Sequence, residues 1–280
     1  MSACLRVVSV SGGKDSTALY LWATYQWGAD FRAVFADTGH EHPVTLNYVR
    51  NLHEMVESPM IKGPKVEWVK ADFSTRLQAK GKTATGDGMH DLLAWKGRAP
   101  STKAQFCTEH LKLAPIRDWL NKIRGDSEVI MYVGIRADES ERRSKMPETE
   151  WSKYYDCEVQ RPLLHWSESM VWTQLRLYNV PPNPLYTELG AARVGCYPCI
   201  HARKSELASM PDWAWDRLRE YEKTTGKSWF SAGTVPGVFI PTIDQVREWA
   251  RTTRGGYQFN LLAPDAKDVP SCMSTWGVCE

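Results

Sequence analysis

Several features are scarce in this sequence of 280 residues, and each absence excludes a class of protein. No stretch approaches the roughly 18 apolar residues that a membrane-spanning helix needs, so no membrane span is expected. The N-terminal stretch MSACLRVVSV is too short and too polar for a secretion signal, and we expect a cytoplasmic protein. The net charge is only +2, which argues against a strongly basic nucleic-acid coat but leaves local basic clusters open.

Cysteine occurs in an odd number, seven, and no export signal is recognised. This combination argues for a reducing compartment and against a disulfide framework. Tryptophan, by contrast, is abundant, with 13 residues. Composition alone is compatible with packing or with stacking on nucleic-acid bases.

Short apolar runs alternate with stretches of helical periodicity through the first three-quarters of the chain. Strands are expected at 5–10, 31–37, 65–70 and 128–136, and helices at 16–27, 44–56, 114–123 and 167–180. Alternating strands and helices imply right-handed crossovers. We therefore predict an α/β fold with a mostly parallel sheet and helices on both faces.

Two segments depart from this alternation. Residues 80–108 are poor in periodicity and rich in Gly, Lys and Thr, which favours a long loop over the site. Helices are expected at 211–226 and 241–256, the second with Thr242 and Gln245 as a capping box and Gly255–Gly256 as its stop. These patterns divide the chain into a nucleotide-binding domain, 1–204, and a helical C-terminal extension, 205–280.

The stretch SGGKDS, residues 11–16, lies between the first predicted strand and the first predicted helix. Backbone N–H groups and the positive helix end favour an anion at such a position. Glycines allow close approach, and Lys14 supplies a mobile positive charge. The spacing is neither that of a Walker loop nor G-x-G-x-x-G. The alternative is an ordinary Gly-Gly turn.

SGGKDS resembles the SGGxDS loop of the PP-loop ATP pyrophosphatases, which bind the pyrophosphate of ATP and cleave between the α and β phosphates. Three further stretches resemble the phosphoadenosine-phosphosulfate (PAPS) reductase family: FADTGHEHPVTLNYV, GIRADESERR, and RPLLHW through NPLY to GCYPC. The resemblance covers about residues 5–205 and implies a Rossmann-like, adenine nucleotide alpha hydrolase-like fold.

The resemblance implies catalytic roles for Lys14, Asp15 and Arg136. It also implies phosphate or acceptor contacts for Arg142 and Arg143, because arginine forks suit phosphate or sulfate. Alternatively, these arginines belong to a solvated run of charges. Asp37 could bind magnesium or the nucleotide, or it could be an aspartate of a turn or a helix cap. The implied nucleotide-binding residues are Ser11, Gly12, Gly13, Lys14, Asp15, Ser16, Asp37, Thr38, Gly134 and Arg136.

Cys196 and Cys199 form a C-x-x-C pair, which by itself fits a redox pair, half a zinc site or half an iron–sulfur site. The family resemblance implies a 4Fe–4S cluster with Cys107 as a third ligand, although its neighbour is Thr108 where the family has a second cysteine. Cys272 is the favoured fourth ligand. Cys279, Cys157 and an open iron position remain alternatives.

Two chemistries compete within the resemblance. An intact SGGKDS loop, a C-terminus without the ECG motif and the missing Cys–Cys pair favour ATP-dependent sulfur transfer over sulfonucleotide reduction. We expect ATP and Mg²⁺ as cofactors and a nucleic acid or nucleotide as acceptor. A sulfur-donor protein such as a cysteine desulfurase is the expected partner, and the protein could form a homodimer. The alternatives are a PAPS or APS reductase and a non-catalytic nucleotide-sensing module.

Overall fold

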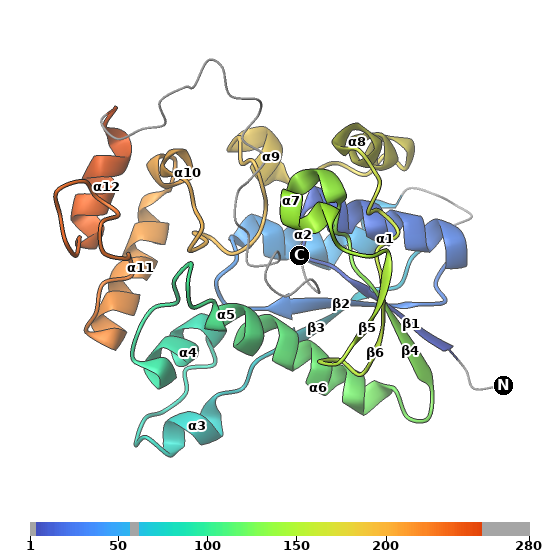
Figure 1. Ribbon diagram of the computed structural model, residues 1–280, viewed down its shortest axis with the longest axis horizontal. Coiled ribbons are helices and arrows are strands. Elements are labelled where there is room, and N and C mark those ends of the chain that lie inside the picture. The colour runs from blue at the N-terminus through green and yellow to red at the C-terminus, as the bar shows by residue number, and fades with distance from the viewer. Residues whose placement is uncertain (1–3, 57–61, 254–280) are drawn as a thin grey trace.

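The computed structural model describes residues 4–56 and 62–253, which contain one six-stranded sheet (Figure 1). Its spatial order is β3-β2-β1-β4-β6-β5, and all neighbouring pairs are parallel except β5 with β6. The strands are β1 Cys4–Ser9, β2 Arg32–Asp37, β3 Val66–Lys70, β4 Glu128–Tyr132, β5 Thr149–Ser152 and β6 Cys157–Gln160.

Fourteen helical segments occur in the described part of the chain. In the first half they are α1 Lys14–Trp27, α2 Pro43–Met55, α3 Ser74–Gln78, α4 Gly88–Lys96, α5 Phe106–Thr108, the π-helix η1 Glu109–Leu113 and α6 Ala114–Ile123. In the second half they are the 3₁₀ turn η2 Ala137–Glu139, α7 Glu141–Ser144, α8 Glu168–Leu177, α9 Pro184–Glu188, α10 Lys204–Ala208, α11 Asp212–Thr225 and α12 Ile243–Arg251.

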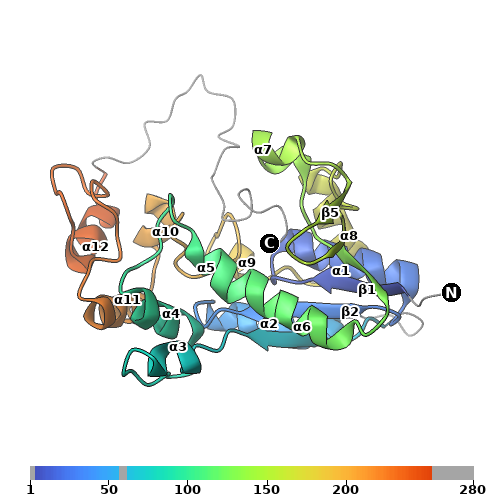
Figure 2. The same cartoon turned by 60° about the horizontal axis from the view of Figure 1, so that its bottom comes forward.

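The sheet is apolar on both faces because successive strand residues point in opposite directions. Val8 of β1 packs with α1, α2 and α8 in one core, whereas its neighbour Val7 packs with Ile116 and Leu120 of α6 in another. Figure 2 shows α6 and α1 on opposite sides of the strands. The predicted α/β fold is therefore confirmed, with helices on both faces.

The four predicted strands form, but the one expected at 128–136 ends at Tyr132. Val133 N still donates to Gln160 O of β6 at 3.0 Å, but the backbone then leaves the sheet and reaches η2, where Ala137 N donates to Leu164 O at 2.7 Å. The hairpin of β5 and β6 is not among the predicted strands; its turn places Asp156 at φ 51°. A short edge hairpin of four-residue strands gives little periodicity to detect.

The prediction of a long loop at 80–108 is wrong in its middle, where α4 forms. Asp87 caps this helix by accepting from His90 N at 2.9 Å, and Gly97 ends it at φ 66°. Leu92 and Leu93 are fully buried. The sequence carried these cap signals, but the apolar face of α4 is covered by helices more than 100 residues downstream.

Those covering helices are α11 and α12 of the C-terminal extension. Trp215, Leu218 and Val246 share one hydrophobic cluster with Leu92 and Leu93 of α4, so the extension shares its core with the first 204 residues. A domain boundary between 204 and 205 therefore stays a prediction.

The capping box predicted for the second C-terminal helix is present: Gln245 N donates to Thr242 Oγ1, and Thr242 N donates to Gln245 Oε1. The predicted stop at Gly255–Gly256 lies outside the described residues. Within residues 4–56 and 62–253, every helix is too short or too polar to cross a membrane.

Leu218→Ala should lower the free energy of unfolding by about 2–5 kcal/mol, because Leu218 is fully buried in the cluster that joins α11 to α4. Urea denaturation followed by circular dichroism measures this change. Leu177→Ala is the control, since Leu177 is 75% exposed and should change stability by less than about 0.5 kcal/mol. A separate early transition in which only the C-terminal helices unfold would contradict the shared core.

Candidate functional site

The glycine loop lies at the carboxyl end of β1, where the strand order reverses between β1 and β4. Open α/β sheets bind ligands in the crevice at such a switch point. Gly12 has φ +80°, and a Cβ there would come within 2.9 Å of methyl groups of Thr45 and Val49. Glycine is therefore required at this position by both backbone conformation and space. Gly13 is the N-cap of α1 and makes no side-chain capping bond.

Three amides of the loop donate to hydroxyl groups. Ser11 N donates to Ser16 Oγ at 3.1 Å, Gly13 N to Ser11 Oγ at 3.3 Å, and Lys14 N to Tyr186 OH at 3.1 Å. These bonds are at the long end of the usual range, so a charged oxygen would be a stronger acceptor. The loop can thus exchange its hydroxyl partners for an anion without losing hydrogen bonds.

The NPLY stretch supports the loop from the start of α9. Asn183 Nδ2 donates to Gly12 O at 3.0 Å and to Thr45 Oγ1 at 3.3 Å, while Asn183 Oδ1 accepts from Leu185 N as the helix cap. Asn183 and Tyr186 were missed as site residues by the sequence analysis. NPLY was noticed there only as a family stretch, and nothing local to it indicates contact with residues 171 positions away.

The charge of Lys14 is paired rather than free in this structure, because its side chain is only 8% exposed and its Nζ lies 2.8 Å from Asp15 Oδ2. The other oxygen of Asp15 accepts from Arg136 Nε, and Arg136 also pairs with Asp138. Burial acts to lower the pKa of Lys14, but the Asp15 carboxylate outweighs it and the pKa is raised. The pKa of Arg136 is raised by the same balance, so both groups remain cations.

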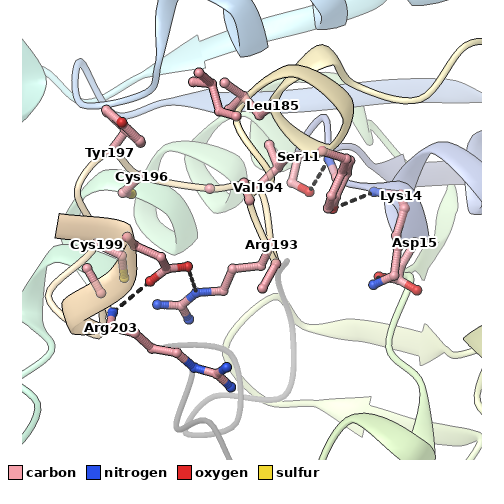
Figure 3. Close-up of a pocket in the computed structure, with 18 of the residues that line it drawn as sticks. Ser11, Lys14, Asp15, Leu185, Arg193, Val194, Cys196, Tyr197, Cys199 and Arg203 are labelled. Atoms are coloured by element: carbon pink, nitrogen blue, oxygen red, sulfur yellow. Dashed lines mark hydrogen bonds and ion pairs between the residues drawn. The ribbon is translucent and has the colours of Figure 1, made fainter. Parts of the chain in front are cut away.

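A cavity of about 680 Å³ opens beside the loop, a volume typical of sites for nucleotide-sized ligands. Figure 3 shows its wall running from Ser11 and Lys14 on one side to Cys196 and Cys199 on the other. The structure therefore brings two predicted motifs, about 180 residues apart in the sequence, to one cavity. The predicted site residues that line it are Ser11, Gly13, Lys14, Asp15, Arg136, Arg143, Cys196 and Cys199.

Other predicted residues lie outside the cavity lining in the described part of the chain. Ser16 and Gly134 are buried, as is Gly12, and they can only shape the site. Asp37 closes a turn by accepting from Gly39 N at 2.9 Å, which is the turn alternative considered for it. Thr38 faces the cysteines, with its Oγ1 3.8 Å from Cys196 Sγ.

Arg142 differs from its neighbour Arg143, because it is exposed and does not line the cavity among the described residues. Arg143 is buried and pairs with Glu139, which holds its guanidinium at the cavity wall.

Arg193 is a cavity residue that the sequence analysis missed. Its Nε lies 3.9 Å from Glu206 Oε1, and its Nη2 is buried with no hydrogen-bond partner among the described residues. Glu206 also accepts from Arg203 N at 2.7 Å at the start of α10. Its position between NPLY and GCYPC was a signal, because both flanking stretches resemble the PAPS reductase family and GCYPC holds two predicted site residues. Other missed lining residues are Lys112, Asp138, Glu139, Glu168 and Arg203.

Cys107, Cys196 and Cys199 line one second, small cavity of about 20 Å³, so the structure brings the three predicted ligands together. Cys196 and Cys199 border both cavities. Thiolates are suitable ligands for an iron–sulfur cluster or for zinc. The space holds about one water molecule, however, and no three potential ligands in residues 4–56 and 62–253 are arranged to hold a metal ion. A cluster would therefore require this cavity to enlarge.

Cys157 lies in β6 inside the core between the sheet and α6, apart from these three thiols. Burial raises the pKa of its thiol to about 11. The alternative that Cys157 is the fourth ligand is therefore wrong, because Cys157 serves as an apolar core residue. Cys272 and Cys279 lie outside the described residues.

His40 fixes the C-x-x-C turn from the side of the sheet. Its Nε2 donates to Pro198 O at 2.9 Å, its backbone O accepts from Tyr197 N at 2.6 Å, and its Nδ1 accepts from Tyr221 OH at 3.3 Å. Burial, with a contribution from Arg217, lowers the pKa of His40 to about 3. The imidazole is therefore neutral, which agrees with its single ring proton being donated to a carbonyl.

A parallel sheet with a glycine loop at its switch point defines a class of nucleotide-binding α/β proteins. Residues 6–202 match the model of the phosphoadenosine phosphosulfate reductase domain, and the chain belongs to this family. The predicted membership is thereby confirmed.

Relatives of the chain include phage and bacterial proteins. An uncharacterised protein of Escherichia phage 186 is 36% identical over 99% of this chain and 97% of its own length. The adenosine 5'-phosphosulfate reductase of Allochromatium vinosum is 30% identical over 54% of this chain and 58% of that enzyme. The solved phosphate complex of the PAPS reductase from Candida auris aligns with a TM-score of 0.45 at 18% identity, covering 69% of this chain and 82% of that one.

Asp15→Asn should destabilise the fold by about 3–5 kcal/mol, because it leaves the buried cations Lys14 and Arg136 without their shared carboxylate. Thermal and urea unfolding measure the loss. Asp30→Asn is the matched control: Asp30 pairs with Arg6 but is 85% exposed, so the change should stay below about 1 kcal/mol. Equal stability of wild type and Asp15→Asn would show that the buried pairs do not hold the loop.

Proposed function

We propose that this protein binds ATP, cleaves it between the α and β phosphates and so activates an acceptor for sulfur transfer. The observation that carries the proposal is the shared cavity: the loop amides form one wall, and the thiols of Cys196 and Cys199 form another. A nucleotide whose phosphates contact the loop would have its α-phosphate in the same cavity as a sulfur nucleophile. Membership of the PAPS reductase family supports nucleotide binding at this loop.

The loop residues would act on the phosphates through charge. The amides of Gly13 and Lys14 would donate to phosphate oxygens at the positive end of α1. Lys14 would turn its ammonium from Asp15 to the departing pyrophosphate, while Arg136 continues to neutralise Asp15. Charge that develops on a leaving group is stabilised most by donors already in place.

Magnesium, when bound, would neutralise and orient the phosphates. Asp15, Asp138 and Glu139 are carboxylates of the cavity wall, and each already contacts an arginine. The proposal therefore assigns the metal mainly to phosphate oxygens. Asp37 does not line the cavity in the described structure, which weakens its assignment as a magnesium ligand.

The three clustered cysteines would hold an iron–sulfur cluster or carry the sulfur directly. The convergence of the three thiols supports the first role, provided that their small cavity enlarges, and the position of Cys196 and Cys199 at the nucleotide cavity supports the second. A cysteine desulfurase as sulfur donor and a homodimeric assembly remain proposals. So does the identity of the fourth ligand, with Cys272 favoured.

Sulfonucleotide reduction is the second candidate, and the similarity to adenosine 5'-phosphosulfate reductases favours it. The two reactions differ in their products. Release of pyrophosphate from ATP would support sulfur transfer. Thiol-dependent release of sulfite from APS or PAPS would instead identify a sulfonucleotide reductase. ATP binding without either product would indicate a nucleotide-sensing module.

Lys14→Ala should reduce ATP-dependent pyrophosphate release by about 10²–10³-fold, because one charged donor to the leaving group is lost. A coupled pyrophosphate assay measures the rate, and calorimetry measures ATP binding. Lys122→Ala, an exposed lysine at the end of α6, should leave both unchanged. Wild-type kinetics in Lys14→Ala would refute the assignment of the loop.

Serine at Cys107, Cys196 or Cys199 should remove most iron from anaerobically purified protein, because each substitution deletes a thiolate ligand. Iron analysis and the visible thiolate–iron absorbance measure the loss. Cys4→Ser is the control, since Cys4 is exposed in β1. Full iron content in Cys196→Ser would refute the cluster.

Cys272→Ala separates a closed site from an open one. Loss of iron would identify Cys272 as the fourth ligand, and full iron content with full activity would favour an open position. A colourless wild-type protein that contains zinc would overturn both versions.

A further inference from the structure

Cations and aromatic rings alternate along α3, α4 and α5, the group of short helices beside α11 in Figure 1. The guanidinium of Arg76 lies 4.7 Å from the ring centre of Trp95, and Nζ of Lys96 lies 4.0 Å from the same centre. Lys96 is also 5.6 Å from the ring of Phe106, over which Arg98 lies at 5.0 Å. We call Arg76, Trp95, Lys96, Phe106 and Arg98 the cationic ladder.

The ring contacts orient these cations without neutralising them. Arg76, Lys96 and Arg98 form no ion pair within 4 Å among the described residues. Burial is the main cause that lowers the pKa of Lys96. The Glu109 carboxylate acts against it, and the cations Arg76, Arg98 and Lys80 lower the pKa further. The surface therefore concentrates positive charge.

Lys80 and Lys82 extend the positive surface along α4. Nζ of Lys80 donates to Trp95 O at 2.6 Å, and Nζ of Lys82 donates to Ala94 O at 3.1 Å. These bonds satisfy carbonyls at the C-terminal end of α4, which explains the placement of both lysines in folding terms. Their charges nevertheless add to the field of the cationic ladder.

The cationic ladder ends beside the thiols. Phe106 is its last ring, and the next residue is Cys107, which lines the small cavity with Cys196 and Cys199. A chain of phosphates that follows the ladder would thus arrive at the cysteines.

We propose that the cationic ladder binds the backbone of a single-stranded nucleic acid and leads one unpaired base toward the cysteines. Arginines that lie over aromatic rings suit phosphate contacts and base stacking. The base must be unpaired because a base inside a duplex cannot enter the larger cavity, which Cys196 and Cys199 border. The bound strand would be the acceptor of the proposed sulfur transfer, and this assignment rests on the proposed function.

Other polyanionic partners fit the surface less well. A membrane surface would need apolar side chains for insertion, and the strongly exposed large apolar residues of the described chain lie outside α3, α4 and α5. An acidic protein would gain nothing from the position beside Cys107. Both classes are nevertheless included as outcomes of the test.

The test is fluorescence anisotropy with labelled single-stranded RNA and DNA of about 16 nucleotides, and with the matching duplexes. The charge reversals Arg76→Glu and Arg98→Glu should each weaken single-strand binding by about tenfold or more. They should also lower the slope of log affinity against log salt by about one per lost phosphate contact. Lys122→Glu, a reversal at an exposed lysine of α6, is the matched control and should bind as wild type does.

Several results would overturn the proposal: equal affinity of Arg98→Glu and wild type, tighter binding of duplex than of single strands, or equal binding of polyglutamate or anionic vesicles. Thermal unfolding of each variant shows whether it is folded. Lys14→Ala separates this inference from the proposed function, because it should lose ATP turnover yet keep oligonucleotide affinity. Loss of oligonucleotide binding in Arg76→Glu with intact ATP binding would be the reciprocal result.

Discussion

The Asp15 carboxylate, shared between Lys14 and Arg136, is the interaction on which the site depends. Each of the three side chains is less than a tenth exposed, so an unpaired charge here would cost several kcal/mol. Because Asp15 has two partners, Lys14 can leave it for an incoming phosphate while Arg136 continues to compensate the carboxylate. The network thus keeps the loop folded without ligand and leaves one cation available for binding.

The position of Arg136 follows from the early end of β4. A strand that continued to residue 136, as expected from the apolar run, would carry Arg136 away along the sheet. The backbone instead turns into η2, where Arg136 N donates to Glu139 Oε2 at 3.2 Å and Ala137 N donates to Leu164 O. This turn directs the guanidinium back to Asp15, which lies 121 residues earlier in the chain.

Local signals allowed the strand–loop–helix at the glycine loop and the alternation of strands and helices to be predicted, and the family resemblance implied the grouping of Cys107 with the C-x-x-C pair. The contacts of Asn183 and Tyr186 with the loop could not be, because nothing within NPLY specifies a partner 171 or 172 residues distant. Helix α4 had its caps in the sequence but depends on α11 for burial of its apolar face. Short-range patterns thus predicted the elements, and long-range packing decided how they meet.

The three thiols differ in how firmly their backbone segments are fixed, and this difference decides which segment can move to open the small cavity. Cys196 and Cys199 lie on a turn that His40 anchors through Pro198 and Tyr197, and Cys196 also pairs with Glu41 in an isolated bridge. That anchor joins the turn to the end of β2, so movement there would disturb the sheet.

Cys107 has a different support. It lies in the three-residue α5, directly before the π-helix η1, whose wider turn is a common feature of functional sites. Adjusting α5 against η1 would displace Cys107 and leave the sheet in place. Because Phe106 belongs to the cationic ladder, a strand bound there would act on the element that must move if the thiols are to admit a cluster or an acceptor.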